Sequence, residues 1–355
     1  YFKQYALKAK PHEPAGFTAP EMGTFMHKIL EQVSREVASM GGYKSVDDET
    51  VTRLCDKYID EYITRELNDF RDKSKRFEYL FRRLTGSVHR IVLDLADELR
   101  RSDFQPLSFE LDFADTPQLP PLELGEGEDK LVLTGVADRV DGWLHEGKLY
   151  LRVVDYKTGR KKFDLSDVLY GMNLQMLLYL FSLGENGKLL YGEEIVPAGV
   201  LYVPARDGVI SVDGDISDAE LEKKRSKGLR RSGLVLSDPE VIRAMEHADT
   251  PKYIPVDFKK NGPAGDALVS AERLGVLAKH IDQTLCEMAS ELRRGSNAAH
   301  PYYAGQQENA CINCDYFDAC RFADGENGES MRSTPHLPAT KVWSVLEGGE
   351  EDGEV

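Results

Sequence analysis

Apolar residues near the start of the chain recur at the spacing of one helix face. The repeating positions are Met22, Phe25, Met26, Ile29, Leu30, Val33 and Val37. This period predicts an amphipathic helix over residues 18 to about 40. Thr18 and Glu21 have the spacing of a capping box, which starts such a helix. Gly23 and His27 lie one turn apart at the edge of the apolar stripe.

The pattern then changes from helical to extended. Residues 47 to 101 place apolar side chains at helical spacing among many charges, so we expect long charged helices there. A strand is expected around Leu107 to Phe113, with Glu110 in it. A loop rich in proline, glycine and acidic residues, Thr116 to Asp129, separates this strand from the next extended segment.

Two alternating stretches, residues 134–144 and 149–157, flank the dipeptide Glu146-Gly147 and predict a β-hairpin. A two-residue turn at that dipeptide fixes every cross-strand pair, and it places Asp138 directly opposite Asp155. One face carries these two acids with Val136, Val140, Leu144, Leu149, Leu151, Val153 and Lys157. The other face carries Arg139, Asp141, Trp143, Lys148, Tyr150 and Arg152, with Asp141 opposite Arg152.

Two opposed acids on an otherwise apolar face call for a cation. Side chains directly opposite each other lie ~4.5–5.5 Å apart at Cβ, where like charges repel. A divalent-metal nuclease site has this design. The alternative is a hairpin with two incidental acids, and a slip of one residue would send both to solvent.

A further helix is expected from about Leu165 to Leu183, followed by a strand near Ala198 to Val203. The helix is apolar nearly all round in its second half, which is typical of a buried helix. Gln175 and Tyr179 lie one turn apart on it, on the side shared with Val168 and Met172. A buried glutamine needs a hydrogen-bond partner. It is either a satisfied core amide or a residue that reaches, with Tyr179, toward the acids or their substrate.

The order of helix, strand, hairpin, helix and strand predicts an α/β fold, a mixed sheet with helices packed on it. Beyond it, Gly208 to Thr250 looks irregular and insertion-like, and Leu268 to Arg294 is expected to be helical. The length of 355 residues suggests one elaborated domain or two, and 41% hydrophobic residues support a substantial core. No run of ~18 apolar residues exists, which excludes a membrane span. Because Tyr1 is not Met and no signal peptide is evident, we expect a fragment of a longer protein.

The net charge of −16 argues against nucleic-acid binding by bulk electrostatics. Part of the acidic excess lies in a tail, residues 347 to 354, that we expect to be disordered. Basic residues nonetheless form two clusters, each more often a solvated helix face than a DNA track. The first cluster is Arg71, Lys73, Lys75, Arg76, Arg82, Arg83 and Arg90, and the second is Lys223, Lys224, Arg225, Lys227, Arg230 and Arg231.

Five cysteines are too few for a disulfide framework in so long a chain. Cys311, Cys314 and Cys320 are spaced as metal ligands, and a reducing, cytoplasmic setting fits best. From spacing alone zinc is favoured.

Taken together, four motifs in this order resemble the RecB-type branch of the PD-(D/E)XK nucleases. The motifs are Gly23-x3-His27, Gly135-x2-Asp138-Arg139-x-Asp141, Asp155-Tyr156-Lys157 and Gln175-x3-Tyr179. With the cysteine cluster that follows, the chain is similar to iron–sulfur members of that branch, of the AddB nuclease-domain type found in bacterial AddAB helicase–nucleases. The resemblance runs from Tyr1 to about Phe322 and implies a restriction-endonuclease-like core with helical insertions.

The resemblance implies a role for each motif residue. Asp138 and Asp155 would bind Mg²⁺, with His27 and the backbone carbonyl of Tyr156 as further ligands. Lys157 would position the attacking water and stabilise the developing charge. Gln175 and Tyr179 would order the site and contact DNA, while Glu110 matches only a weaker acidic position and is expected to be peripheral.

The resemblance also favours a structural [4Fe-4S] cluster over zinc at the cysteines. Such a cluster takes four thiolates, and only three are grouped here. In the family the first cysteine precedes an aromatic pair like Tyr1-Phe2, so we expect it just upstream of this chain. Cys55 and Cys286 are the alternatives, although their apolar helical settings are typical of buried structural cysteines.

The implied function is a Mg²⁺-dependent DNA exonuclease module of a helicase–nuclease that processes double-strand breaks, with an AddA-type helicase–nuclease subunit as partner and the 5′-ended strand as substrate. We expect a nuclease domain over residues 1–325 and an acidic, disordered tail over 326–355. The domain divides into a core (about 18–40 and 105–205), insertions (about 45–101 and 208–262) and the cysteine cluster (311–320). Two alternatives are a compact CRISPR-adaptation Cas-type iron–sulfur nuclease and a non-catalytic DNA-binding scaffold of the same fold.

Overall fold

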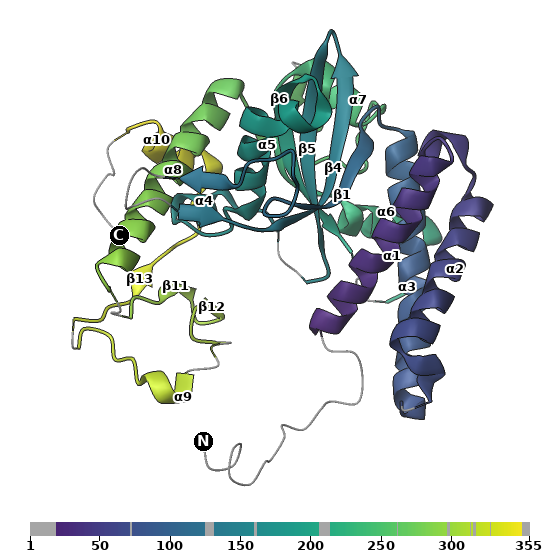
Figure 1. Cartoon of the computed structure of the whole chain (residues 1–355), viewed down its shortest axis with the longest axis horizontal. Coiled ribbons are helices and arrows are strands. Elements are labelled where there is room, and N and C mark those ends of the chain that lie inside the picture. The colour runs from purple at the N-terminus through teal and green to yellow at the C-terminus, as the bar shows by residue number, and fades with distance from the viewer. Residues whose placement is uncertain are drawn as a thin grey trace.

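The computed structural model describes residues 19–71, 73–124, 131–159, 162–205, 214–260, 262–296, 299–312, 314, 317–326 and 328–349. A mixed six-stranded sheet lies at the centre in the order β1-β4-β5-β6-β7-β10, with helices on both faces (Figure 1). Its strands are β1 (Gln105–Asp112), β4 (Val136–His145), β5 (Lys148–Lys157), β6 (Glu194–Pro204), β7 (Ser232–Leu236) and β10 (Leu268–Val269). The predicted α/β arrangement is confirmed.

The α-helices are α1 (Ala19–Ser39), α2 (Asp48–Glu66), α3 (Lys75–Arg100), α4 (Leu165–Leu169), α5 (Gln175–Tyr191), α6 (Asp218–Leu229), α7 (Pro239–Met245), α8 (Ala271–Arg293), α9 (Phe317–Cys320) and α10 (Ala339–Leu346). Short 3₁₀ turns lie at Tyr43–Ser45 and Asn68–Phe70. Small sheets pair β2 (Leu122–Leu124) with β3 (Leu131–Leu133), β8 (Asp257–Lys259) with β9 (Gly262–Ala264), and β11 (Tyr302–Gly305) with β12 (Glu308–Asn309) and β13 (Arg332–Ser333). Among the described residues, none of the helices combines the length and apolar character needed to span a bilayer.

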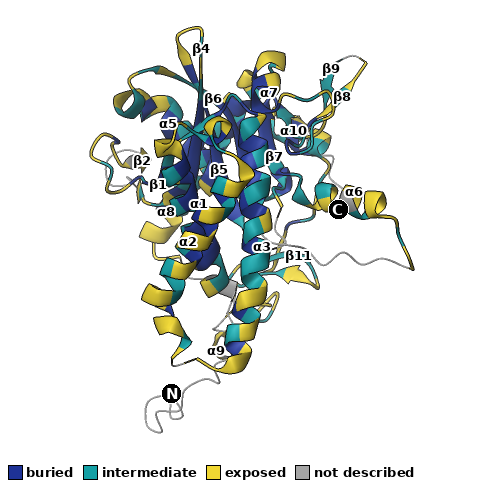
Figure 2. Cartoon of the chain, turned by 90° about the vertical axis from the view of Figure 1, so that its right-hand side faces the viewer, coloured by how far each residue is buried: buried dark blue, intermediate teal, exposed yellow. Residues whose placement is uncertain are grey.

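The first three helices form where the apolar periodicity predicts them. The stripe of α1 is buried from Phe25 to Val37, whereas its capping residue Thr18 lies outside the described residues. The helices α2 and α3 are capped by Asp47 and Ser74, whose side chains accept hydrogen bonds from backbone N–H groups one turn on. Figure 2 shows the outward faces of α1 and α2 exposed while the central strands are buried.

The β4–β5 hairpin has the predicted register. Glu146 (φ 49°) and Gly147 (φ 76°) are both left-handed, as a type I′ turn requires. The ladder pairs His145 with Lys148 at the turn and continues to Arg139 and Val154. Asp138 and Asp155 are the next residues along the two strands.

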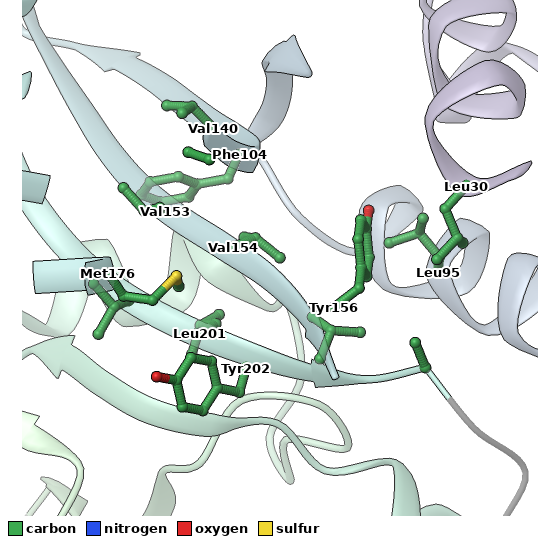
Figure 3. Packing of buried hydrophobic residues seen from close by; sticks show 14 of the residues in the cluster. Leu30, Leu95, Phe104, Val140, Val153, Val154, Tyr156, Met176, Leu201 and Tyr202 are labelled. Atoms are coloured by element: carbon green, nitrogen blue, oxygen red, sulfur yellow. The ribbon is translucent and has the colours of Figure 1, made fainter. Parts of the chain in front are cut away.

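Both faces of this hairpin are covered. Figure 3 shows Tyr156 pointing toward Leu30 of α1 and Leu95 of α3, with Met176 of α5 and Tyr202 of β6 on the other side of β5. Because side chains alternate along a strand, one face of β5 lies against α1 and α3 and the other against α5.

The face toward α3 buries a chain of ionised side chains, which we call the buried charge network. Its members, Arg139, Asp141, Arg152, Glu98 and Arg231, are at most 3% exposed. Asp141 Oδ2 accepts hydrogen bonds from Arg139 Nη2 at 3.0 Å and Arg152 Nε at 2.8 Å. Glu98 accepts from Arg231 Nη2 at 2.7 Å and from Arg152 Nη2 at 3.5 Å. Burial alone would raise the pKa of Glu98, but Arg231 and Arg152 outweigh it and lower that pKa.

The predicted single helix over 165–183 is wrong, because the chain breaks it into α4 and α5. Gly171 (φ 77°) and Asn173 (φ 55°) adopt left-handed conformations between the two helices. A Cβ at Gly171 would lie 2.9 Å from Met288 Cε of α8, so α8 packs directly against this break. Val168 and Met172 consequently share no helix face with Gln175.

The segment expected to be irregular, Gly208 to Thr250, is also structured. It contains α6, β7 and α7, while residues 206–213 lie outside the described residues. The strand β7 pairs antiparallel with β6 and parallel with β10, so this segment completes the central sheet. The expected boundaries between core and insertions remain a prediction.

The expectation of a disordered tail from residue 326 is wrong as far as Gly349. The strand β13 pairs with β11, and α10 buries Val342 and Trp343 against the core formed with α4 and α8. Apolar residues at helical spacing within this acidic segment explain the difference. Glu350 to Val355 lie outside the described residues.

We predict that Arg231→Met destabilises the fold by about 3–5 kcal/mol, because removing one partner leaves a buried carboxylate poorly compensated. The free energy of unfolding in urea measures this loss. The matched control is Arg225→Met on the exposed side of α6, which is expected to change stability by about 0.5 kcal/mol or less. Equal effects of the two substitutions would show that the Glu98–Arg231 contact adds nothing.

Candidate metal centre

Three residues with metal-binding side chains meet at one end of the sheet. His27 comes from α1, Glu110 from β1 and Asp138 from β4. One ligand atom of each lies within 4.8 Å of the others. The amphipathic α1 helix turns His27 toward the strand ends because its apolar stripe is buried against the core.

The backbone of Tyr156 completes this arrangement. Its carbonyl oxygen lies 2.8 Å from His27 Nε2, and its N–H donates to Asp138 Oδ2 at 2.8 Å. His27 Nδ1 lies 3.5 Å from Asp138 Oδ1. An octahedral Mg²⁺ ion holds neighbouring ligand atoms about 2.9 Å apart. The His27 nitrogen and the Tyr156 carbonyl are within hydrogen-bond distance in the metal-free protein, and the same spacing would suit two adjacent ligands of one ion.

Asp155 and Lys157 lie on β5 beside this group rather than within it. Lys157 Nζ is 2.6 Å from Asp155 Oδ2 and sits 4.9 Å from the centroid of the Tyr202 ring. Both side chains are mostly buried, at 16% and 29% exposed for the aspartate and the lysine. The structure thus places the ammonium group next to the acids, as the alternation along β5 predicts.

The carboxylates destabilise one another when no cation is bound. Burial raises the pKa of Asp138, and Asp155 adds to this rise, although His27 and the N–H of Tyr156 oppose it. Burial likewise raises the pKa of Glu110, with Asp138 as the next cause. Such accumulated negative charge is a driving force for binding a divalent cation.

Glu110 is the residue whose position the sequence analysis misjudged. The expectation that it is peripheral is wrong, because its carboxylate belongs to the group with His27 and Asp138. Its backbone is left-handed (φ 47°) within β1, a conformation that costs a non-glycine residue about 1–3 kcal/mol. The register of β1 on β4 brings it opposite Asp138, between the pairs Phe109–Arg139 and Leu111–Ala137. Because no tight turn joins β1 to β4, the sequence alone gives no such register.

Gln175 and Tyr179 are neighbours, as their spacing predicts. Gln175 Nε2 donates to Tyr179 Oη at 2.7 Å, and the Tyr179 ring stacks on Phe113 at 4.5 Å between centroids. The expectation that Gln175 is buried is wrong, because it begins α5 and is exposed. Burial raises the pKa of Tyr179. The two residues line an apolar pocket of about 140 Å³ together with Phe113, Leu133, Thr134 and Leu178.

The two motif glycines, Gly135 and Gly23, differ in how closely neighbouring side chains approach them. A Cβ at Gly135 would lie 1.9 Å from Tyr179 Oη, so only glycine lets the tyrosine approach the start of β4. At Gly23 the nearest atom, Thr158 Oγ1, would be 3.7 Å away, which is an ordinary contact.

The three clustered cysteines lie near the C-terminal end, where Cys311 and Cys314 follow strand β12 and Cys320 ends helix α9. Cys311 is half-buried, Cys314 and Cys320 are exposed, and none of the three forms a disulfide. His336 ties this region to the core, with Nε2 3.0 Å from Glu308 and Nδ1 2.7 Å from Asp164. Thiol groups so placed are accessible to a metal, and the region around Tyr1 lies outside the described residues.

The two basic clusters and Cys55, also selected from the sequence, differ in how far they are exposed to solvent. The first basic cluster is exposed on and before α3, while Arg230 and Arg231 of the second turn inward. Arg230 donates to the carbonyls of Ile254 and Val256, so these two arginines are structural. Cys55 is fully buried in α2, as expected for a structural cysteine.

Residues 1–321 match the PD-(D/E)XK nuclease superfamily. The chain is 31% identical over 364 residues to an ATP-dependent helicase/deoxyribonuclease subunit of Clostridium acetobutylicum, covering 100% of this chain and 32% of that protein. It is 34% identical over 364 residues to the protein of the same name from Caldanaerobacter subterraneus subsp. tengcongensis, covering 99% and 31%. The chain therefore spans about a third of the length of these relatives.

We predict that Gly135→Ala destabilises the protein by about 1–3 kcal/mol, because the added methyl group displaces Tyr179. Tyr179→Phe in the same chain should recover part of the loss, since it removes the atom in closest contact. Gly23→Ala, within α1, is the control and should stabilise by up to about 1 kcal/mol through helix propensity. Unfolding in urea measures all three, and a neutral Gly135→Ala would contradict the close approach.

A second prediction concerns the metal-free protein. Because the pKa of Asp138 is raised in the folded state, its stabilising contribution is present below the unfolded pKa and is lost as pH rises through the folded pKa. Asp138→Asn should therefore raise the Tm without metal near neutral pH, and this gain should shrink in acid. Added Mg²⁺ should raise the Tm of the wild-type protein only.

The control for this prediction is Asp155→Asn, which breaks the contact with Lys157 and should give no such gain. A lower metal-free Tm for Asp138→Asn than for the wild-type protein at neutral pH would contradict the electrostatic description of the site.

Proposed function

The chain belongs to the PD-(D/E)XK nuclease superfamily, and on that basis we propose that it hydrolyses phosphodiester bonds of DNA with Mg²⁺. The observation that carries this proposal is the grouping of His27, Glu110 and Asp138, with one ligand atom of each within 4.8 Å of the others. The carbonyl of Tyr156 lies beside His27. Carboxylate and carbonyl oxygens are the ligands that Mg²⁺ prefers, and one imidazole nitrogen is compatible with such a site.

Asp138, Glu110, His27 and the Tyr156 carbonyl would hold the ion, with Asp155 beside them on β5. When bound, the ion supplies Lewis-acid stabilisation of the phosphate and lowers the pKa of a bound water. Lys157 brings a positive charge to the same edge, where it would offset the negative charge that develops on the phosphate oxygens. The contact with Asp155 fixes the direction of its ammonium group.

Gln175 and Tyr179 would orient the DNA beside this centre. Tyr179 lies against Gly135 and is held by stacking on Phe113, so its position is rigid. Exposed Gln175 offers an amide at the mouth of the apolar pocket. An apolar wall next to a charged metal site suits a nucleotide, whose sugar and base adjoin a phosphate.

We extend the proposal to the biological role: an exonuclease module of a helicase–nuclease that processes double-strand ends for recombinational repair in the cytoplasm. The named relatives are ATP-dependent helicase/deoxyribonuclease subunits, and the chain aligns with about a third of each. A partner subunit of the AddA type and attack on the 5′-ended strand follow from the resemblance. A compact Cas-type nuclease fits less well, because α6, β7 and α7 add to the sheet and its surroundings.

We also propose that Cys311, Cys314 and Cys320 hold a structural [4Fe-4S] cluster, with a fourth thiolate from outside the described residues. Their accessible thiols and their spacing in the sequence support a metal site, and zinc is the competing occupant. All three are among the described residues, and the structure does not bring their sulfur atoms within 4.8 Å of one another, so the metal would draw them together. Iron analysis with visible absorbance of the protein, extended upstream of Tyr1, distinguishes the two.

The central prediction is loss of Mg²⁺-dependent nuclease activity in Asp138→Ala and Lys157→Ala, each by about 100-fold or more in kcat. Glu110→Gln should also lose activity, since the structure groups it with the ligands. Lys28→Ala is the control and should keep full activity, because Lys28 is next to His27 in the chain but contacts exposed Glu66 and the ring of Tyr62. A non-catalytic scaffold predicts no Mg²⁺-dependent cleavage in any of the proteins, including the wild type.

A further inference from the structure

We infer that Arg139 is a positioning residue for the metal centre, acting through Tyr156 from the opposite face of the hairpin. The inference rests on the proposed function and names a residue that touches none of the candidate ligand side chains. It concerns how the chain holds a backbone carbonyl at the place where a metal ligand is needed.

The contact between the two residues is direct and buried. Arg139 Nη1 donates to Tyr156 Oη at 2.6 Å, and its guanidinium group lies 5.4 Å from the centroid of the Tyr156 ring. Arg139 is 0% and Tyr156 4% exposed, so water does not compete for this hydrogen bond. The side chain of Tyr156 is therefore anchored at its far end as well as by packing against α1 and α3 (Figure 3).

The backbone of the same residue carries both links to the metal centre. The peptide N–H of Tyr156 holds Asp138 Oδ2, and its carbonyl faces His27 Nε2. Because peptide groups are planar, fixing the Cα–Cβ direction of Tyr156 limits rotation of the two peptide planes that flank it. A change at the hydroxyl group can thus shift the carbonyl without touching any ligand side chain.

Arg139 is itself held in place by the rest of the buried charge network. Asp141 binds Arg139 and Arg152 with one oxygen, and Arg152 reaches Glu98 on α3. Glu98 in turn binds Arg231, which follows α6. These side chains are surrounded by protein, and a guanidinium group presents its donors in a rigid fork. The network thereby connects α3 and the segment after α6 to the position of one tyrosine ring.

Two roles for this contact make different predictions. A purely structural hydrogen bond would change the stability of the protein and leave metal affinity alone. A positioning contact would weaken metal binding by about 10–100-fold, the range seen when a partner of a metal ligand is removed. Saturating metal would restore kcat in the second case, since the chemical groups are all present.

The experiment compares Tyr156→Phe with Tyr43→Phe by calorimetric titration with Mn²⁺ and by nuclease assay over a range of Mg²⁺ concentrations. Tyr43 is the matched control, because it is buried in the same core and its hydroxyl pairs with Ser34 at 2.8 Å. Both substitutions remove one buried hydroxyl and keep the ring. Arg139→Lys is the second variant, since lysine keeps the charge and loses the fork.

We expect Tyr156→Phe to bind Mn²⁺ about 10–100-fold more weakly and to need correspondingly more Mg²⁺ for half-maximal activity, with kcat largely kept. Tyr43→Phe should bind Mn²⁺ as the wild-type protein does. Wild-type affinity in Tyr156→Phe would overturn the inference while Asp138→Ala still loses binding. If Asp138→Ala also binds Mn²⁺ normally, the proposed metal centre itself is wrong.

Discussion

The register of the β4–β5 hairpin is the constraint on which the rest of the molecule depends. Two left-handed residues, Glu146 and Gly147, set it by closing a two-residue turn. Because side chains alternate, that turn sends Asp155 and Lys157 to one face and Arg152 to the other. A shift of one residue would exchange the acids proposed to bind the metal with the arginines that pair inside the core. The same local geometry therefore produces both a charged site at the strand ends and the buried charge network beneath it.

Much of this arrangement follows from local sequence signals. Period and turn chemistry predict α1, the hairpin and its pairing. The motif spacing selects candidate residues that the structure brings to one end of the sheet, namely His27, Asp138, Asp155 and Lys157. The missed features are those that depend on contacts between distant segments. Glu110 joins the site through the β1–β4 ladder, and the break before α5 accommodates α8. Likewise, α10 is helical because Val342 and Trp343 find a core to pack against, which its acidic surroundings hide.

The candidate site contains features that destabilise the fold, and contacts close to it stabilise the fold. Burial raises the pKa values of Asp138 and Glu110, and a nearby carboxylate adds to each rise, Asp155 for Asp138 and Asp138 for Glu110. Glu110 also has a left-handed backbone inside a strand. Such features are costly to a fold and are typical of positions kept for chemistry. Nearby contacts stabilise the fold, since Arg139 and Arg152 share Asp141 and α1 buries its apolar stripe from Phe25 to Val37.

The contact of Arg231 with Glu98 also bears on how this protein can be divided. Residues 214–260 resemble an insertion that a shorter, engineered version could omit. Arg231 within this segment, however, supplies the positive charge that keeps Glu98 ionised between α3 and the sheet. Truncation there would remove a counterion from the interior as well as strand β7, which lies between β6 and β10 in the sheet. Borders chosen by motif position alone would therefore yield a destabilised fragment, and a workable minimal enzyme must retain this segment or replace Glu98 with a neutral side chain.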